Sequence, residues 1–227
     1  MNKKKSLLVG ILLPLLTLLS LKPFWAAEAE SSFLDEFETF DSTKWGCIGD
    51  PNGKWSAENG VLIMEGQDQR ITSTKKFRYA TFQTKISLLA QEDGVTYYYL
   101  GFVNRENWLA GKDCDSITLM SEDGMSFKLD VKKSGQKLAR IPIDVTFFKG
   151  AWHTIEIVWT PSAIKVLIDE EVMAEYTDVE NIPDTFLSAF IDECHLKKGK
   201  CLMQVDYVKV RGGEVKGEKA GRQERNP

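Results

Sequence analysis

Few residue types in this chain could carry covalent or metal chemistry. It has two histidines, His153 and His195, and its four cysteines form neither a Cys-x-x-Cys motif nor a cluster with zinc spacing. No Gly-x-Ser-x-Gly motif and no glycine-rich phosphate loop occur. His153 lies at the start of a predicted strand, where a structural hydrogen bond is its expected role. The chemistry left open is that of carboxylates, hydroxyls and aromatic rings.

The aromatic candidates are three consecutive tyrosines, Tyr97–Tyr99, and Trp108 in a polar loop. A pyranose stacks its apolar face on an aromatic ring while its hydroxyls form hydrogen bonds at the edges. In a strand, Tyr98 must point to the face opposite to its neighbours. We expect Tyr98 and Trp108 to stack on a sugar, and the alternative for Tyr98 is a place in the core or on the sheet surface. The other tryptophans of the mature chain are expected to be structural: Trp45, Trp55, Trp152 and Trp159.

The first 29 residues have the three parts of a secretory signal peptide. Lys3–Lys5 give a basic start, Leu7–Leu21 an apolar stretch, and Ala27-Glu28-Ala29 a small-residue cleavage site. The apolar stretch is shorter than the roughly 20 residues that a membrane-spanning helix needs. We therefore expect cleavage before Glu30 and an extracytoplasmic protein, periplasmic or secreted, with no stable membrane span. An uncleaved anchor is the alternative.

Net charge limits the binding partners expected for an exported chain, and the cysteine count predicts its disulfides. Cleavage removes four lysines and Glu28 from a chain of formal net charge −4, which leaves about −7. An acidic surface repels nucleic acid and anionic lipid, so neither is an expected partner. Four cysteines outside the cytoplasm predict two disulfides, with three possible pairings. We expect Cys194–Cys201 to close the loop between them and Cys47 to pair with Cys114.

Short segments rich in β-branched and aromatic residues alternate with turn signals along the chain. The predicted strands are Val61–Glu65, Arg78–Leu89, Val95–Val103, Ser116–Met120, Ser126–Val131, Thr154–Thr160, Ala163–Ile168, Thr185–Ile191 and Met203–Arg211. The turn pairs are Asn59-Gly60, Asp93-Gly94, Asp123-Gly124 and Ser134-Gly135. No segment of about 12 residues keeps a helical period, so a two-sheet antiparallel β-sandwich is expected. Residues 30–211 should form this one domain, as a monomer, and the tail 212–227 is predicted to be disordered.

Several motifs in order resemble the concanavalin A-like jelly rolls, and within them the laminarinase-type enzymes of glycoside hydrolase family 16. These motifs are Phe33–Phe37 with Trp45, Asn59–Leu62, Thr72-Ser73 with Phe77–Ile86, Trp152–Pro161 with its histidine-threonine and tryptophan-threonine-proline pairs, and the closing strand Val205–Val210. The resemblance spans nearly the whole mature chain and implies a jelly-roll fold. Because such a fold hosts enzymes, lectins and inert spacers, activity depends on the site itself.

Active members of that family carry Glu-Ile-Asp-Ile-Met-Glu on a strand of the concave sheet, the first Glu as nucleophile and the last as acid and base. The retaining reaction needs two carboxyl groups about 5 Å apart, and a one-residue bulge returns the last acid to the face of the first. The matching segment here is Ser116-Ile-Thr-Leu-Met-Ser121, with Ser116, Thr118 and Ser121 at the acid positions. Gln83 stands where the family tends to have a glutamate. Hydrolysis is therefore expected to be absent, and these four side chains either hydrogen-bond sugar hydroxyls or remain from an inactive groove.

Two weaker site predictions remain. Asp113 and Asp115 precede the matching segment and form a substitute catalytic pair if the alignment is off by one or two residues, although solvated loop charge is the commoner fate of such acids. The resemblance also implies a structural calcium held by Asp206 and by carbonyls near the first hairpin. No other cofactor is expected.

The predicted function is that of an exported, non-catalytic jelly-roll domain that binds a polysaccharide or glycoconjugate in its concave groove. The first alternative is an active glycosidase that hydrolyses a β-glucan or galactan. The second is a structural or protein-interaction domain of the cell envelope whose groove is filled.

Overall fold

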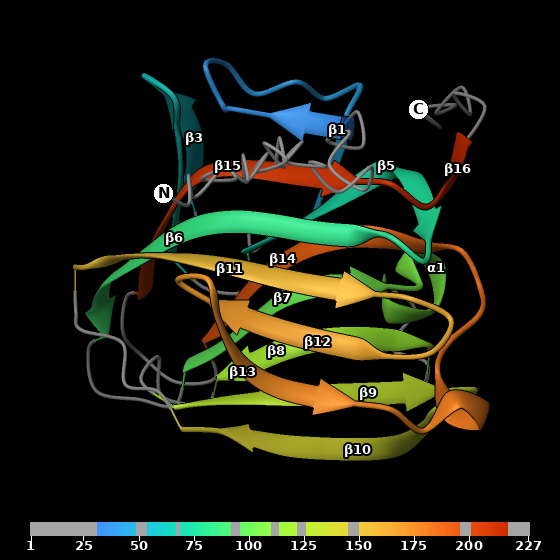
Figure 1. Cartoon of the computed structure of the whole chain (residues 1–227). Helices are drawn as coiled ribbons and strands as arrows, with labels where there is room; N and C mark the ends of the chain where they lie inside the picture. The colour runs from blue at the N-terminus through green and yellow to red at the C-terminus, as the bar shows by residue number, and fades with distance from the viewer. Residues whose placement is uncertain are drawn as a thin grey trace, which may run out of the picture.

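The computed structural model describes residues 31–48, 54–66, 69–91, 96–109, 114–121, 126–144, 150–195 and 201–217. In this part of the chain two antiparallel sheets of eight strands pack face to face, with sheet A in front of sheet B in Figure 1. Sheet A has, in spatial order, β13 (Glu171–Tyr176), β12 (Ile164–Ile168), β11 (Trp152–Trp159), β6 (Thr81–Gln91), β15 (Cys201–Arg211), β4 (Val61–Gly66) and β3 (Lys54–Glu58), with β1 (Ser31–Asp35) paired to β15. Sheet B has β10 (Gln136–Ile143), β9 (Phe127–Lys133), β8 (Ser116–Ser121), β7 (Thr96–Val103), β14 (Leu187–His195), β5 (Gln69–Arg78) and β16 (Glu214–Gly217), with β2 (Trp45–Ile48) paired to β5. The predicted two-sheet antiparallel sandwich is confirmed.

Strand alternation builds the core between the sheets. In β11, Ile155, Ile157 and Trp159 are buried while the residues between them are partly exposed. The Trp159 ring packs against Phe102 of sheet B, with ring centroids 5.4 Å apart. Burying each large apolar side chain contributes about 1.5–3 kcal/mol, so this interdigitated layer is the main stabilising term. Each sheet therefore has an inner face in the core and an outer face.

Tight turns join several neighbouring strands. Asn59-Gly60 between β3 and β4 and Ser134-Gly135 between β9 and β10 have positive φ at both residues. Such turns match the right-handed twist of a hairpin and favour Asn or Gly, so these two turn predictions are confirmed. Asp169-Glu170 makes the same kind of turn between β12 and β13 without a glycine. Asp93-Gly94 and Asp123-Gly124 lie outside the described residues.

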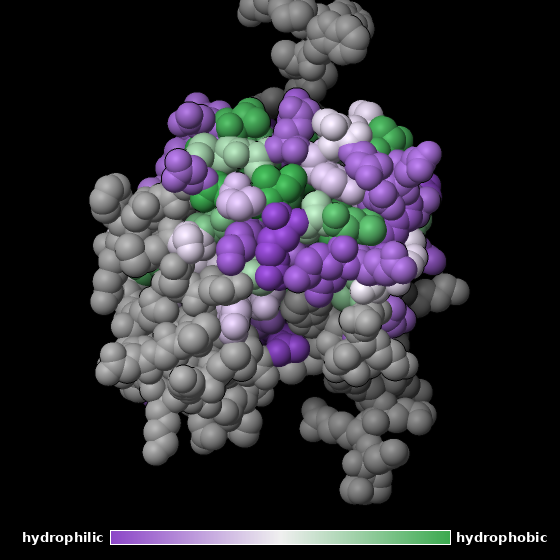
Figure 2. All heavy atoms as spheres, turned by 90° about the horizontal axis from the view of Figure 1, so that it is seen from below, coloured by the Kyte–Doolittle hydropathy of each residue, from purple (hydrophilic) through white to green (hydrophobic). Residues whose placement is uncertain are grey.

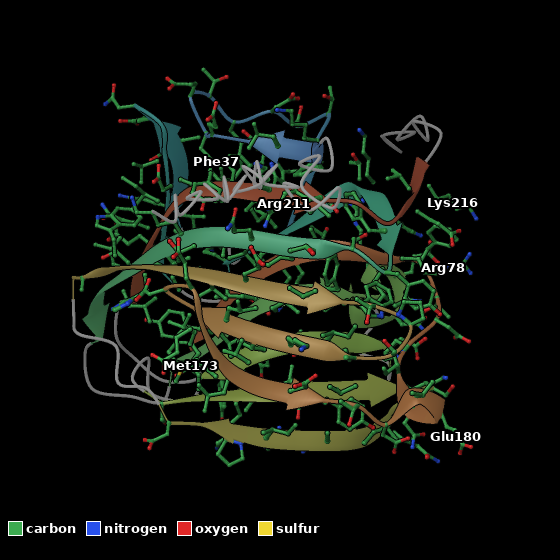
Figure 3. All side chains as sticks on the ribbon, viewed as in Figure 1. Phe37, Arg78, Met173, Glu180, Arg211 and Lys216 are labelled. Atoms are coloured by element: carbon green, nitrogen blue, oxygen red, sulfur yellow. The ribbon has the colours of Figure 1, made fainter. Side chains whose placement is uncertain are left out.

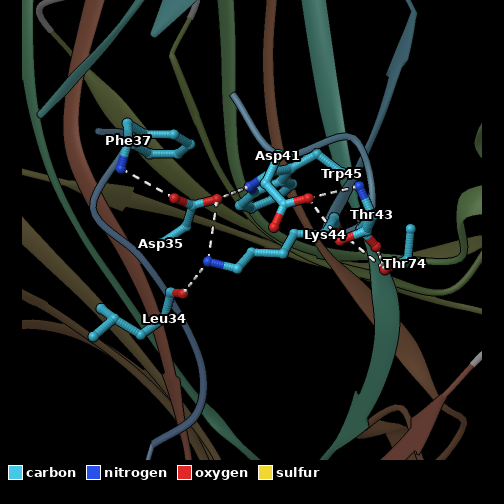
Figure 4. Close-up of polar contacts among 8 residues, drawn as sticks. All are labelled: Leu34, Asp35, Phe37, Asp41, Thr43, Lys44, Trp45 and Thr74. Carbon is cyan, nitrogen blue, oxygen red and sulfur yellow. Dashed lines mark hydrogen bonds and ion pairs between the residues drawn. The ribbon is translucent and has the colours of Figure 1, made fainter. Parts of the chain in front are cut away.

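A buried carboxylate ties the first segments of the two sheets together (Figure 4). Asp35, at the end of β1, accepts hydrogen bonds from the Phe37 N–H at 3.0 Å and from the Trp45 indole N–H at 2.6 Å. Lys44 approaches the same carboxylate at 3.9 Å and donates to the Leu34 carbonyl. Because Trp45 begins β2 of sheet B, this network fixes where the chain crosses between the sheets.

Seven strands have no counterpart among the strand segments that alternation predicted: β1, β2, β3, β5, β10, β13 and β16. Several of them have mixed sequences, such as Gln136–Ile143 in β10, and they form because a neighbouring strand supplies hydrogen-bond partners. The prediction of a disordered tail is wrong for its first residues, since Glu214–Gly217 pair with β5. Residues 1–30, with the predicted signal peptide, and 218–227 lie outside the described part. Within the described ranges, no helix has the length and apolar character that crossing a membrane requires.

The sheets end in strands with a hydrophilic surface. Figure 2 looks at the end of the molecule where β10 and β13 lie, and hydrophilic side chains surround smaller apolar areas there. Exposed charges on these strands include Lys137 and Arg140 of β10 and Glu175 of β13. Charged edge strands hinder pairing with the sheet of another molecule, which agrees with the expected monomer without testing it.

The structure does not show the disulfide expected between the two cysteines whose side chains it describes. Cys47 on β2 is a free thiol, and Cys114 just before β8 is buried. Burial raises the pKa of the Cys47 thiol to about 11, although the nearby Arg105 guanidinium acts to lower it. The Cys47–Cys114 disulfide stays a prediction. The side chains of Cys194 and Cys201 lie outside the described part.

Candidate functional site

The candidate catalytic strand β8 lies in the middle of sheet B, between β7 and β9. Both pairings keep a constant register, so the expected one-residue bulge is absent from β8. With regular alternation, Ser116, Thr118 and Met120 point to the outer face of sheet B, while Ile117 and Leu119 enter the core. Ser121 then shares the inner face, directly opposite the core residue Tyr98. The expectation that Ser121 joins Ser116 on one face is wrong.

Two serine hydroxyls stand out on the outer face of sheet B. Ser116 of β8 and Ser188 of β14 both lie opposite Val103 of β7, one on each side. Both serines are 0% exposed, and neither hydroxyl has a hydrogen-bond partner. Two strand spacings separate them, which is about 10 Å. Buried hydroxyls without partners are uncommon and point to a missing hydrogen-bonding group.

Two buried carboxylates that sequence reasoning missed lie on the same face. Asp130 of β9 accepts a hydrogen bond from Arg140 Nε at 3.0 Å, and Asp192 of β14 lies 3.7 Å from Arg70 Nε. Three strand spacings separate their strands, about 14 Å, whereas glycosidases use carboxyl groups about 5–9.5 Å apart. They are not placed as a hydrolytic pair. The signal in the sequence was an acid at an outward position between apolar residues, as in Leu129-Asp130-Val131.

The tyrosines of β7 take the opposite faces from those expected for stacking. Tyr98 is 1% exposed and belongs to the core cluster, so it cannot stack on a ligand. Tyr97 and Tyr99 point to the outer face of sheet B and are partly exposed. Their rings stack at 6.3 Å between centroids with 21° between planes. Trp108 belongs to the short helix α1 (Arg105–Leu109), and its side chain lies outside the described part.

Two predicted site residues lie on the other sheet. Gln83 points to the outer face of sheet A, where its amide donates to Glu156 at 3.0 Å; Arg211, labelled in Figure 3, also pairs with Glu156. Gln83 is therefore separated from Ser116 by the whole core, and its assignment to the groove is wrong. Asp206 lies on the same outer face and pairs with Lys85 at 3.1 Å. Among the described residues no three His, Cys, Asp or Glu side chains gather as metal ligands.

Asp115 fixes a loop junction just before β8. One of its carboxylate oxygens accepts a hydrogen bond from the Ser134 N–H in the β9–β10 turn, and the other accepts one from the Thr185 hydroxyl at 2.7 Å. Its predicted catalytic partner Asp113 lies outside the described residues. The contacts of Asp115 are those of a structural tie.

The outer face of sheet B is a buried layer of its own. Val103, Met120 and Phe190 are buried there although they are not part of the core cluster between the sheets. Thr118 is also buried, and the longer side chains of Lys128, Lys132 and Arg140 on β9 and β10 reach solvent. This face thus combines buried small polar groups, two arginine–aspartate pairs and a partly exposed tyrosine pair.

Comparison with known proteins gives the fold. No protein-family model and no curated protein matches the chain. A β-1,3-1,4-glucanase (lichenase) from a mouse hindgut metagenome has a TM-score of 0.65 at 17% identity, over 79% of this chain and 98% of that one. A substituted LamA from Zobellia galactanivorans, in complex with laminaritriose and laminaritetraose, has a TM-score of 0.66 at 17% identity, over 82% and 100%. The Bacillus licheniformis β-glucanase has a TM-score of 0.66 at 14% identity, over 80% and 98%. The chain has the jelly-roll fold of the family 16 glucanases, as the resemblance implied.

Proposed function

We propose that this protein is a non-hydrolytic, extracytoplasmic jelly-roll domain that binds a polysaccharide or glycoconjugate on the outer face of sheet B. One observation carries the proposal: β8, the strand that the sequence resemblance matches to the family's catalytic strand, presents Ser116 and Thr118 outward in a regular register. A neutral hydroxyl can neither form the glycosyl ester at neutral pH nor protonate a leaving group. It can donate to and accept from sugar hydroxyls.

The tyrosine pair supports binding of a sugar. Tyr97 and Tyr99 offer partly exposed rings beside a floor of hydroxyl and charged groups, the combination that recognises a pyranose by its apolar face and its polar rim. A laminarin oligosaccharide is bound by one protein of the same fold, which makes β-glucans the first ligands to try. The predicted signal peptide supports a site of action outside the cytoplasm.

The test is a glycan array combined with a reducing-sugar assay on the full chain. We expect binding without release of reducing ends. Tyr97→Ala with Tyr99→Ala should weaken binding by about 10-fold or more, whereas Trp152→Ala, which removes an exposed ring from the outer face of sheet A, should not. Release of reducing ends by the purified protein would overturn the proposal in favour of an active glycosidase.

A second candidate function rests on the burial of the floor. Ser116, Thr118, Ser188 and Asp192 are all nearly inaccessible, as expected if the face is closed and the domain has a structural or protein-interaction role in the cell envelope. The same array separates the two candidates, because a closed face binds no glycan. Cleavage before Glu30 is checked by N-terminal sequencing of the exported protein.

A further inference from the structure

A row of side chains crosses sheet B at the level of the two unpartnered serines. The pairings place them side by side on the outer face in the order Lys76, Ser188, Val103, Ser116, Lys132 and Lys137. Lysines thus lie on both sides of the serines, one strand spacing away, about 5 Å. Lys76 also pairs with Glu106 of α1 at 3.0 Å, a carboxylate that is 74% exposed. The row carries cationic groups beside buried hydroxyls.

Basic residues dominate the other outward positions of sheet B as well. Arg70, Arg78, Lys128 and Arg140 join the three lysines of the row, and the outward acids on the same strands are Asp130 and Asp192. Both acids are buried, and each lies beside an arginine. The described outward positions of these strands therefore hold seven cations and two carboxylates, and the edge strand β16 adds Lys216 and Glu214, the latter paired with Arg78. The formal net charge of the chain is −4.

The outer face of sheet A has no such excess. Its outward cations are Lys54, Lys85, Lys165, Lys209 and Arg211, and its outward acids are Glu58, Glu65, Glu156, Glu175 and Asp206. Five cations face five acids, several of them in direct ion pairs. The basic character is thus specific to the sheet that carries β8.

We infer that the glycan bound by sheet B is acidic, a polysaccharide bearing carboxylate or sulfate groups, an inference that rests on the proposed function. Lysine and arginine side chains of the row and of β9 and β10 bind the anionic groups. The Ser116 and Ser188 hydroxyls are 0% exposed, so they hydrogen-bond the sugar hydroxyls only when the side chains that cover them move aside. Cationic side chains on a protein of opposite net charge give orientation and selectivity as well as affinity. A neutral glucan can contact the hydroxyls and the tyrosines, but it has no anionic group to pair with the lysines.

The test measures binding of three probes to the full chain by isothermal titration calorimetry: laminarin as a neutral glucan, alginate as a carboxylated polymer and dextran sulfate as a sulfated one. At about 20 mM salt we expect an acidic probe to bind at least about 10-fold more tightly than laminarin, and its advantage to shrink at about 300 mM salt because the ions screen the charges. The stronger of the two acidic probes identifies the anionic group. Laminarin binding as tightly as the stronger acidic polymer overturns the inference and leaves the proposed function intact. Failure of all three probes and of the glycan array overturns both.

Matched variants separate this face from general attraction of a polyanion. The double variant Lys132→Gln with Lys137→Gln should weaken acidic-probe binding about 10-fold and leave laminarin binding unchanged. The double variant Lys165→Gln with Lys209→Gln removes the same charge from sheet A and should change acidic-probe binding by less than about 2-fold. Equal losses in the two double variants would mean unspecific attraction and overturn the inference. Ser116→Ala should weaken binding of the acidic probe; Ser87→Ala, which removes a buried, unpartnered hydroxyl from sheet A, is its control.

Discussion

Side chains alternate between the core and the outer face in both sheets, but ion pairs on the two outer faces differ in how deeply they are buried. On sheet A two outward ion pairs are close to half-exposed: both side chains are 40% exposed in Lys85–Asp206 and 43% in Lys165–Glu175. On sheet B the Arg70–Asp192 pair has exposed fractions of only 17% and 2%. A solvated pair contributes little to stability, whereas a buried pair is costly to break. The Lys85–Asp206 pair is therefore a surface feature of sheet A, whereas the Arg70–Asp192 pair belongs to a buried layer on sheet B.

The largest expected effect is the loss of a buried carboxylate on sheet B. Asp192→Ala should lower the free energy of unfolding by about 3–5 kcal/mol, because it leaves the mostly buried Arg70 guanidinium without this partner. Asp206→Ala on sheet A should change it by less than about 1 kcal/mol. Urea unfolding followed by tryptophan fluorescence measures both. Similar losses in the two variants would remove the distinction between the faces.

The next effect concerns the thiol on β2 of sheet B. Since its pKa is raised to about 11, Cys47 is almost wholly protonated at pH 8 and should react with a thiol reagent on the order of 100-fold more slowly than an exposed cysteine. Alkylation quenched at successive times and followed by mass spectrometry gives the reaction rate of Cys47 in the folded protein. Alkylation after unfolding without reductant serves as the control: a Cys47 that stays unmodified there is in a disulfide, which would establish a bond that the structure does not show.

A smaller effect is expected for the unpartnered hydroxyls. Ser116→Ala and Ser188→Ala should leave the free energy of unfolding unchanged or raise it by up to about 1 kcal/mol, because each removes a buried hydroxyl that has no hydrogen bond. Ser87→Ala on sheet A should behave alike. Thermal unfolding of the three variants checks this. A clear destabilisation confined to the sheet B serines would mean that their hydroxyls have structural partners, which contradicts their assignment to a ligand.

The smallest effect is a pH dependence on the sheet A side. Burial acts to raise the pKa of Asp169, but its hydrogen bonds with His153 and the Thr154 N–H outweigh burial and lower it below the ordinary 3.8. A lowered folded pKa gives stability that is complete above the ordinary value and is lost as pH falls through the folded value. The difference in stability between the natural chain and Asp169→Asn should thus shrink as pH falls below about 4. Urea unfolding between pH 5 and about 2.5 measures it, and a constant difference would exclude this contribution.

Alternation gave the β-sandwich and most of its central strands, because apolar residues at every second position fix which face of a strand is buried. The same rule explains why the predicted roles of Tyr98 and Ser121 were wrong. Alternation showed that Tyr98 and its neighbours take opposite faces of the strand, but it did not show which face meets the core. In the structure Tyr98 belongs to the core and pairs with Ser121, so both side chains are on the inner face of sheet B. In strands such as β10 the apolar alternation is weak, and the strand forms because the neighbouring strand β9 supplies its hydrogen-bond partners.

The sequence by itself determined the fold class and the likeness to the glucanase jelly rolls, since these are properties of residue type and order along the chain. That hydroxyl residues replace catalytic acids on β8 stays a prediction. Only the tertiary structure decided that Gln83 belongs to the other sheet, that β8 has no bulge, and that Lys76, Ser188, Ser116 and Lys132 form one row. Residues more than 100 positions apart become neighbours in that row. Their adjacency depends on strand order and register, which are set by packing of the whole sandwich rather than by any local segment.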